Sequence, residues 1–424
     1  HEPMPNLYDY KYKRTFAHYR PLKVKDAPNG IIGIPRVLNM YENYPLWFTI
    51  FTRLGFRVQL SARSTHDIYD KGIDSIPSES VCYPAKLTHG HVMDLIQKGV
   101  KTIFYPDLPY EMVENKNANN HYNCPIVTSY PEVLKNNMEE LMNGEVTYLN
   151  PFLGLHHPKK LAEKLLETLH EAGYTSITEK EMREAVKAGY EEYERYKEDI
   201  VDEGLRILDW IEENDHKAIV LAGRPYHVDP EINHGIPELI NSLGMAVLTE
   251  DAVARPGKLK RPIRVVDQWM YHSRLYEAAA AVAENPRLEL VQLNSFGCGL
   301  DAITTDQTQE ILESSGDLYT CLKIDEVSNL GAARIRLRSL KVAMEERERQ
   351  AERREKLLAA KDEAEKAADE ITKDEPDYVI DREIFTKEMQ KEGYTLLCPQ
   401  MAPTQFAMIE AGLRRHGYNV VVLK

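Results

Sequence analysis

The sequence is poor in cysteine and lacks long apolar runs. It has 5 cysteines in 424 residues, an odd number at low density, and none of them forms a CxxC pair. This excludes a disulfide framework, a ferredoxin-type motif and a zinc ribbon, and it favours thiol or metal chemistry. No segment reaches the roughly 18 apolar residues of a membrane span. Residues 1–20 also lack the apolar core of a signal peptide.

The balance of charge excludes a further class of partner. The formal net charge is −14, whereas a nucleic-acid binder needs a basic face to neutralise phosphates. We therefore expect a cytoplasmic protein that binds neither nucleic acid nor membrane. Apolar residues make up 43% of the chain. That is enough for the cores of the two or three domains that a chain of this length suggests.

One supersecondary pattern occurs three times. A strand, a loop with proline, a helix, a glycine and a second strand follow one another within residues 33–60, 218–248 and 394–423. In the second of these, residues 231–243 are expected to form one helix. Strand–helix–strand order is typical of parallel sheets. We predict an α/β fold with two flavodoxin- or Rossmann-like parallel-sheet domains, helical insertions and a long charged C-terminal helix.

The predicted domain boundaries follow these patterns. Residues 1–30 are an N-terminal extension, 31–210 a first α/β domain with a helical segment, and 211–331 a second α/β domain. Residues 332–374 are nearly all helix-forming and charged, without a clean heptad of apolar positions. They indicate a helical linker with a solvated face rather than a coiled coil. Residues 375–424 start a further β-α-β unit.

Three cysteines stand near strand ends or helix starts. Cys82 precedes an expected helix with Pro84 in its first turn. Cys124 lies between an Asn-rich loop and an apolar run, and Cys298 lies between a strand at 288–293 and a helix at 305–314. Ligands gather at the carboxyl ends of strands in open α/β sheets, and helix N-termini lower thiol pKa values. Glycines on both sides of Cys298 allow a cofactor to approach the backbone closely.

Spacing alone leaves the role of these cysteines open. Thiolates suit iron–sulfur clusters, but ordinary buried thiols give the same pattern, and three cysteines with a histidine such as His227 leave a structural zinc site as another reading. Cys321 alternates with polar residues and reads as a core thiol in a strand. Cys398 reads as structural, or as a ligand belonging to a partner module. The loop at 223–227 suits an anion or a substrate, and equally an ordered turn.

Four segments carry a resemblance to a known family: GIPRVLNMYE at 33–42, IPSESVCYPAK at 76–86, GRPYHVDP at 223–230 and NSFGCG at 294–299. Over about residues 5–330 the sequence resembles the uncharacterised domain of CoA enzyme activases. That domain is similar to the cluster-binding subunits of 2-hydroxyacyl-CoA dehydratases and to double-cubane cluster proteins. The resemblance implies that Cys82, Cys124 and Cys298 hold a [4Fe-4S] cluster, or half of a double-cubane [8Fe-9S] cluster, with one iron left open.

The resemblance also implies a function. It implies an iron-sulfur cluster-binding subunit or domain that accepts low-potential electrons from an ATP-dependent activator. The chain would be part of a dehydratase-like or ATP-dependent reductase system acting on an acyl-CoA or another small molecule, in a homo- or heterodimer. Glu79, beside Cys82, is a candidate proton donor, with a plain helix-start carboxylate as the alternative. The alternative function is a non-catalytic scaffold or regulatory domain that docks an activator.

Overall fold

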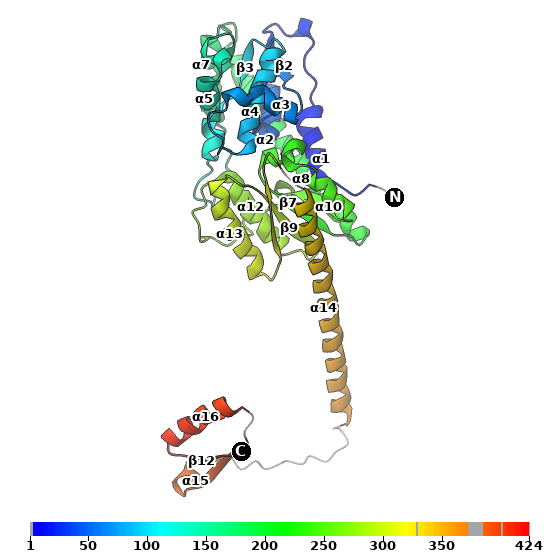
Figure 1. Cartoon of the computed structure of the whole chain (residues 1–424), viewed down its shortest axis with the longest axis vertical. Helices are drawn as coiled ribbons and strands as arrows, with labels where there is room; N and C mark the ends of the chain where they lie inside the picture. The colour runs from blue at the N-terminus through cyan, green and yellow to red at the C-terminus, as the bar shows by residue number, and fades with distance from the viewer. Residues whose placement is uncertain (1–2, 328–329, 372–384, 400–401, 424) are drawn as a thin grey trace. The chain divides into compact units, whose positions relative to one another are not determined.

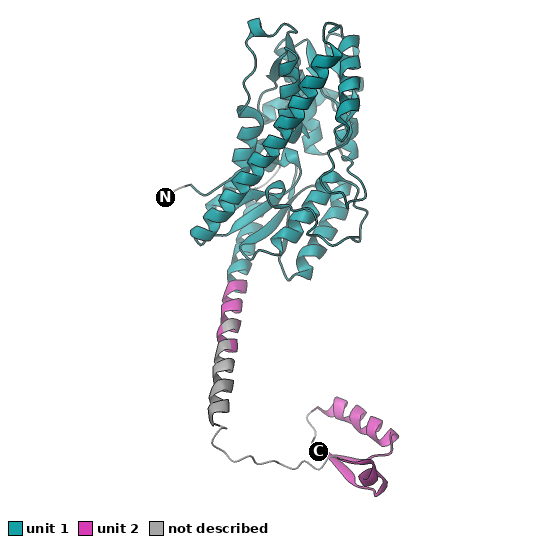
Figure 2. Cartoon of the chain, turned by 180° about the vertical axis from the view of Figure 1, so that it is seen from behind, with its two compact units in different colours: residues 1–346 teal, residues 347–424 magenta. Residues whose placement is uncertain are grey.

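The structure, a computed structural model, describes residues 3–327, 330–371, 385–399 and 402–423 (Figure 1). The chain divides into two compact units, residues 1–346 and 347–424 (Figure 2). This division falls inside the charged helix that we predicted as a linker. The other predicted domain boundaries stay predictions.

The first unit contains two four-stranded sheets in which every pairing is parallel. The first sheet, in the order β2-β1-β3-β5, consists of β1 (Ile31–Ile34), β2 (Arg57–Leu60), β3 (Thr102–Phe104) and β5 (Thr147–Leu149). The second sheet, in the order β10-β9-β7-β8, consists of β7 (Ala218–Ala222), β8 (Ala246–Thr249), β9 (Leu288–Ser295) and β10 (Tyr319–Ile324). A separate parallel pair is formed by β4 (Asp107–Tyr110) and β6 (Phe152–Gly154). The inner strands β7 and β9 are buried along their whole length, as inner strands of parallel sheets usually are.

Helices surround both sheets (Figure 1). Those up to the end of the first sheet region are α1 (Leu7–Tyr12), α2 (Met40–Arg53), α3 (His66–Gly72), α4 (Tyr83–Gln97), α5 (Pro125–Asn137), α6 (Glu139–Met142) and α7 (Pro158–Glu171). After the connecting helix α8 (Glu179–Glu213) come α9 (Pro230–Asn233), α10 (Ile236–Ser242), α11 (Glu250–Val253), α12 (Met270–Val282) and α13 (Gly299–Ser314). The charged helix α14 (Leu330–Ile371) follows β10. Short π and 3-10 turns lie at Lys13–Ala17, Val24–Asp26, Ile73–Ser75 and Pro225–Val228.

The predicted fold class is confirmed, with two parallel-sheet regions and a long charged helix in the C-terminal region. One predicted helix is wrong. Residues 231–243 form two short helices, α9 and α10, because His234 and Gly235 both take left-handed backbone angles, with φ of 54° and 80°. Glycine adopts this conformation without steric cost. The His234 ring is fixed there by a 2.7 Å hydrogen bond between Nε2 and the Asp325 carbonyl.

Helix α8 spans both sheet regions of the first unit (Figures 1 and 2). It begins with a capping box between Thr178 and Glu181. Along its length it packs against α2 and α7 in the first sheet region and against α11 and β8 in the second. Two glycines allow these close approaches. A Cβ on Gly189 would lie 2.7 Å from Ile50 of α2, and a Cβ on Gly204 would lie 2.6 Å from Ala252 of α11.

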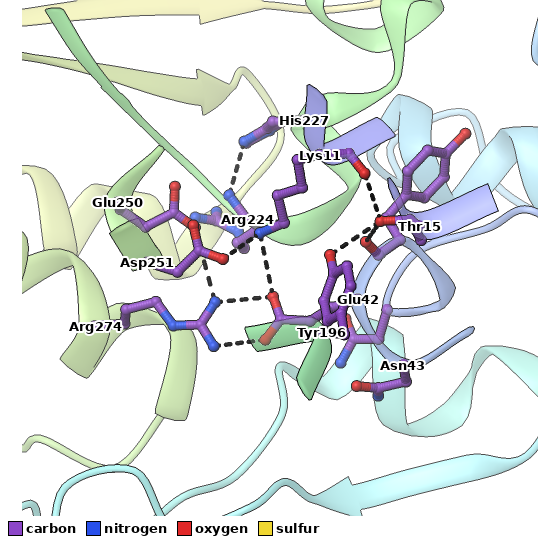
Figure 3. Close-up of polar contacts among 12 residues, drawn as sticks. Lys11, Thr15, Glu42, Asn43, Tyr196, Arg224, His227, Glu250, Asp251 and Arg274 are labelled. Atoms are coloured by element: carbon purple, nitrogen blue, oxygen red, sulfur yellow. Dashed lines mark hydrogen bonds and ion pairs between the residues drawn. The ribbon is translucent and has the colours of Figure 1, made fainter. Parts of the chain in front are cut away.

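A buried polar network also joins the two sheet regions (Figure 3). Arg274 on α12 donates two hydrogen bonds, of 2.8 and 2.5 Å, to the carboxylate of Glu42 on α2. Lys11 on α1 lies 3.6 Å from Glu42 and 2.6 Å from Asp251. The side chains of Lys11, Glu42 and Arg274 are only 1%, 1% and 3% exposed. Buried charges of this kind are tolerated only when they are paired.

The second unit contains a small β-α-β arrangement. Strands β11 (Thr395–Pro399) and β12 (Asn419–Leu423) pair in parallel, connected by α16 (Pro403–Arg415), and α15 (Lys387–Lys391) precedes them. This matches the pattern seen in the sequence. Among the described residues of both units, no helix combines the length and the apolar character that crossing a membrane requires.

Candidate functional site

Cys82 is the residue immediately before helix α4. Its backbone is extended, and Pro84 occupies the first turn of the helix, where proline is favoured because no amide hydrogen is needed. The preceding loop contacts the loop that carries Cys298, since a Cβ on Gly297 would lie 3.0 Å from the Ser80 carbonyl oxygen. Two loops from different sheet regions therefore meet at Cys82.

Cys124 has the same position relative to helix α5. It is the N-cap residue, followed by Pro125, and its Sγ accepts a hydrogen bond from the Val127 amide at 3.4 Å. The loop before it is fixed to the second sheet region. The Tyr122 amide donates to the Gln268 carbonyl at 2.9 Å, and the Tyr122 carbonyl accepts from the Met270 amide at 3.0 Å. Cys124 is thus also positioned by both regions.

Cys298 is the N-cap residue of helix α13 and follows strand β9. Arg224 follows the neighbouring strand β7. In the strand order β10-β9-β7-β8, the chain runs outward in opposite directions from this pair of strands. Such a switch point leaves a crevice at the carboxyl ends of the strands, where ligands commonly bind. The topology explains why two residues distant in the sequence meet, with Arg224 Nη2 3.3 Å from Cys298 Sγ.

The three thiols lie close enough to influence one another. Burial, with Cys124 and Cys298 nearby, raises the pKa of the Cys82 thiol to about 12 against the opposing effects of the Ala85 amide and Arg224. Burial likewise raises the pKa of Cys124, with Cys298 adding to the effect and the Val127 amide and Arg224 opposing it. In the metal-free protein these two thiols are protonated at neutral pH. Because a metal ligand must be a thiolate, metal binding here would release protons.

Arg224 places a buried positive charge at this group of thiols. Its side chain is 4% exposed, and its Nη2 is hydrogen-bonded to Asp301, which is fully buried in the first turn of α13. Its Nε donates to the Tyr226 hydroxyl at 2.9 Å. Its Nη1 is buried and has no hydrogen-bond partner among the described residues.

Buried aromatic and histidine side chains also lie near the thiols and the Arg224–Asp301 pair. The Tyr105 hydroxyl is buried and has no hydrogen-bond partner within the described part of the chain. Burial raises the pKa of Tyr105, and Cys124 and Cys82 are among the neighbours that raise it further. His272 lies with its Nε2 3.9 Å from Asp301 Oδ1. Burial holds the pKa of His272 well below its usual range, so the ring is neutral.

The arrangement of the cysteines and their neighbours can be compared with the ligands that a zinc ion and an iron–sulfur cluster require. In the part of the chain that the structure describes, no three His, Cys, Asp or Glu side chains converge to hold a single metal ion. A structural zinc site needs four ligands around one ion, so this geometry gives it no support. In an iron–sulfur cluster each thiolate binds its own iron, which calls for a wider spacing. The unpartnered donors of Arg224 and Tyr105 suit a group that carries negative charge.

Comparison with protein families gives a match over residues 31–253, more than half of the chain. The matching family is the CoA enzyme activase uncharacterised domain. The chain belongs to this family. No curated protein matches the chain. The matched segment includes Cys82, Cys124 and Arg224, whereas Cys298 lies beyond it.

The structure also places the other residues that the sequence indicates as candidates. Glu79 is exposed in the loop before Cys82. His227 accepts a 2.9 Å hydrogen bond at Nδ1 from the Arg224 amide, and this bond helps to order the loop at 223–227 (Figure 3). Cys321 lies on the edge strand β10 and is half-buried rather than in the core, as are the two residues before it, Tyr319 and Thr320. Cys398 lies on β11 in the second unit.

Several residues around the thiols were not found from the sequence. The sequence indicates Arg224 only as part of the loop at 223–227, and it carries no local signal for Asp301, Tyr105 or His272. Asp301 and Arg224 form a buried ion pair between residues far apart in the chain, and no local pattern reveals such a pair. The available signal was indirect: Arg224 and Cys298 each follow an apolar strand, and adjacent parallel strands end at the same edge of a sheet.

Proposed function

We propose that the chain binds a [4Fe-4S] cluster, or half of a double-cubane [8Fe-9S] cluster, through Cys82, Cys124 and Cys298. In this proposal it accepts low-potential electrons from an ATP-dependent activator for reductive or radical chemistry on a small molecule. The observation that carries the proposal is the arrangement of three cysteines at the N-termini of α4, α5 and α13, where burial and the nearby Cys124 and Cys298 raise the pKa of Cys82. Family membership supports the association with CoA enzyme activases.

Each part of the arrangement has a chemical reason. Helix N-termini present backbone amides and a partial positive charge, which stabilise thiolates and the negative charge of a cluster. Burial by Tyr105 and Tyr226, each 4% exposed, would keep water away and influence the reduction potential. Three protein ligands leave one iron open, and when bound the cluster would supply one-electron chemistry and a position for a ligand. The chain's own residues would hold it, exclude water and balance its charge.

The first experiment tests cluster binding. The full chain is purified without oxygen, reconstituted with iron and sulfide, and analysed for iron, sulfide and zinc. We expect a brown protein with about four irons per chain. Cys82→Ala, Cys124→Ala and Cys298→Ala should each lose most of this iron. Cys321→Ala is the matched control, since it removes a half-buried thiol from the same unit and should keep it.

The outcomes separate the competing functions. A colourless wild-type protein after reconstitution refutes cluster binding, and one zinc per chain would favour the zinc alternative. Electron transfer is tested by mixing the cluster-loaded chain with an activator of this type, ATP and a reductant, while the reduced cluster is followed by electron paramagnetic resonance. A loaded cluster that the activator never reduces would favour the scaffold function instead. Circular dichroism of each variant shows whether its fold is intact.

A further inference from the structure

The environment of Arg224 differs from that of an ordinary buried ion pair. Only part of its guanidinium is used: Nε and Nη2 reach Tyr226, Asp301 and Cys298, and the buried Nη1 has no partner within the described residues. Leaving a buried donor unpartnered costs about 1 to 3 kcal/mol. An arginine needed only for structure would not have to keep a donor free beside a thiol.

The position of Arg224 is fixed from two sides. It lies two residues after the end of β7, and Asp301 reaches it from the first turn of α13, whose N-cap residue is Cys298. The second carboxylate oxygen of Asp301 accepts a hydrogen bond from the Ser295 amide at 3.3 Å, so Asp301 is itself anchored to the end of β9. Arg224 therefore cannot move away from Cys298 without leaving the Asp301 carboxylate buried and unpaired.

Arg224 brings a fixed, buried positive charge to the group of thiols, with its Nη2 3.3 Å from Cys298 Sγ. A cluster held by three thiolates carries net negative charge, and each electron that it accepts adds one more. A buried positive charge beside it stabilises the reduced form more than the oxidised form.

We propose that Arg224, held in place by Asp301, is a positioning residue that donates hydrogen bonds to the cluster environment and raises the reduction potential of the cluster. The proposal rests on the proposed function, because it needs a cluster at Cys82, Cys124 and Cys298. Nη2, 3.3 Å from Cys298 Sγ, would donate to the Cys298 thiolate. The unpartnered Nη1 would be the donor left for a negatively charged group. Asp301 partly offsets the charge of Arg224 and so limits the size of its effect.

The test is a redox titration of the reconstituted full chain with dithionite, which adds one electron to the cluster, monitored by electron paramagnetic resonance. Arg224→Gln removes the charge while keeping donors, and we expect a lower midpoint potential at unchanged iron content. Arg224→Lys keeps the charge and should stay closer to wild type. Asp301→Asn removes the opposing negative charge, and we expect a higher midpoint potential.

A matched control uses another cation near the site. Lys86 lies on α4, one turn after Cys82, but its Nζ is paired with Glu326 at 2.9 Å. Lys86→Gln should shift the potential less than Arg224→Gln. The proposal is overturned if Arg224→Gln keeps both its iron and the wild-type potential, or if Lys86→Gln gives an equal shift. If Arg224→Gln loses iron, Asp301→Asn decides the question by the sign of its shift. A wild-type chain that binds no iron refutes the proposed function instead.

Discussion

The buried network between the two sheet regions allows a quantitative prediction for Arg274→Met. Arg274 makes two hydrogen bonds to Glu42 and two to Glu114, the latter at 3.0 and 2.7 Å. Its removal leaves Lys11 as the remaining buried cation beside Glu42 and Asp251. Removing one partner of a buried ion pair typically costs about 3 to 5 kcal/mol. We expect the free energy of unfolding of the variant to fall by about that amount.

The assay is urea unfolding of the full chain, followed by circular dichroism. Arg287→Ala is the control, because the Arg287–Asp215 pair has a similar length of 2.9 Å but side chains 34% and 91% exposed. Exposed pairs contribute only about 0 to 1 kcal/mol. The double variant Arg274→Met with Glu42→Gln removes one of the stranded carboxylates and should recover part of the loss. A change for Arg274→Met as small as that of the control would refute the reasoning.

Two further predictions concern helix α4, which Cys82 precedes. Gly90→Ala would place a Cβ 1.7 Å from the Ile68 carbonyl oxygen of α3, so we expect a loss of about 1 to 3 kcal/mol or more in thermal unfolding. Gly412→Ala, whose Cβ would meet nothing within 4 Å, is the control, and an equal effect of both would contradict the packing argument. Burial alone would raise the pKa of Asp94, but hydrogen bonds from Lys71, Lys98 and the Ala62 amide lower it to about 2. Because this pKa lies below the unfolded value, Asp94 stabilises the fold above about pH 4, and the effect is lost as the pH falls towards 2. Asp94→Asn should therefore cost about 1 to 2 kcal/mol at pH 7, and a difference from wild type that does not shrink in acid would contradict the assignment.

The repeated strand–helix–strand pattern made the parallel sheets predictable, because apolar strands and a glycine after each helix are local signals. The break at His234 and Gly235 was missed, although Gly235 followed by Pro237 is a signal for the end of one helix and the start of another. The spacing of apolar residues over 231–243 favoured one continuous helix, and this prediction took precedence over the signal for a break. A contact with the distant Asp325 fixes His234, and such a contact cannot be read from a local window.

The candidate site, like the fold, was predictable only where local patterns in the sequence determine the structure. The placement of Cys82, Cys124 and Cys298 next to strand ends or helix starts followed from local order. The helix after Cys298 was expected at 305–314, but it begins at Gly299, directly after the cysteine. The pairing of Arg224 with Asp301 depends on which strands become neighbours, and one sequence does not reveal the strand order. Cys321 was expected in the core, but β10 is an edge strand of its sheet, and the residue is half-buried.

Helix α8 has a consequence for motion. Proteins with two sheet regions commonly open a cleft by bending a flexible linker, but here the connecting segment is a helix of 35 residues, which at 1.5 Å per residue is about 52 Å long. At Gly189 and Gly204, helix α8 packs closely against both regions. A hinge movement would therefore have to break two tight contacts at once. Entry to the thiols would therefore depend on local opening of the loops before α4, α5 and α13. In amide hydrogen exchange, those loops should exchange quickly while the middle of α8 stays among the slowest segments of the chain.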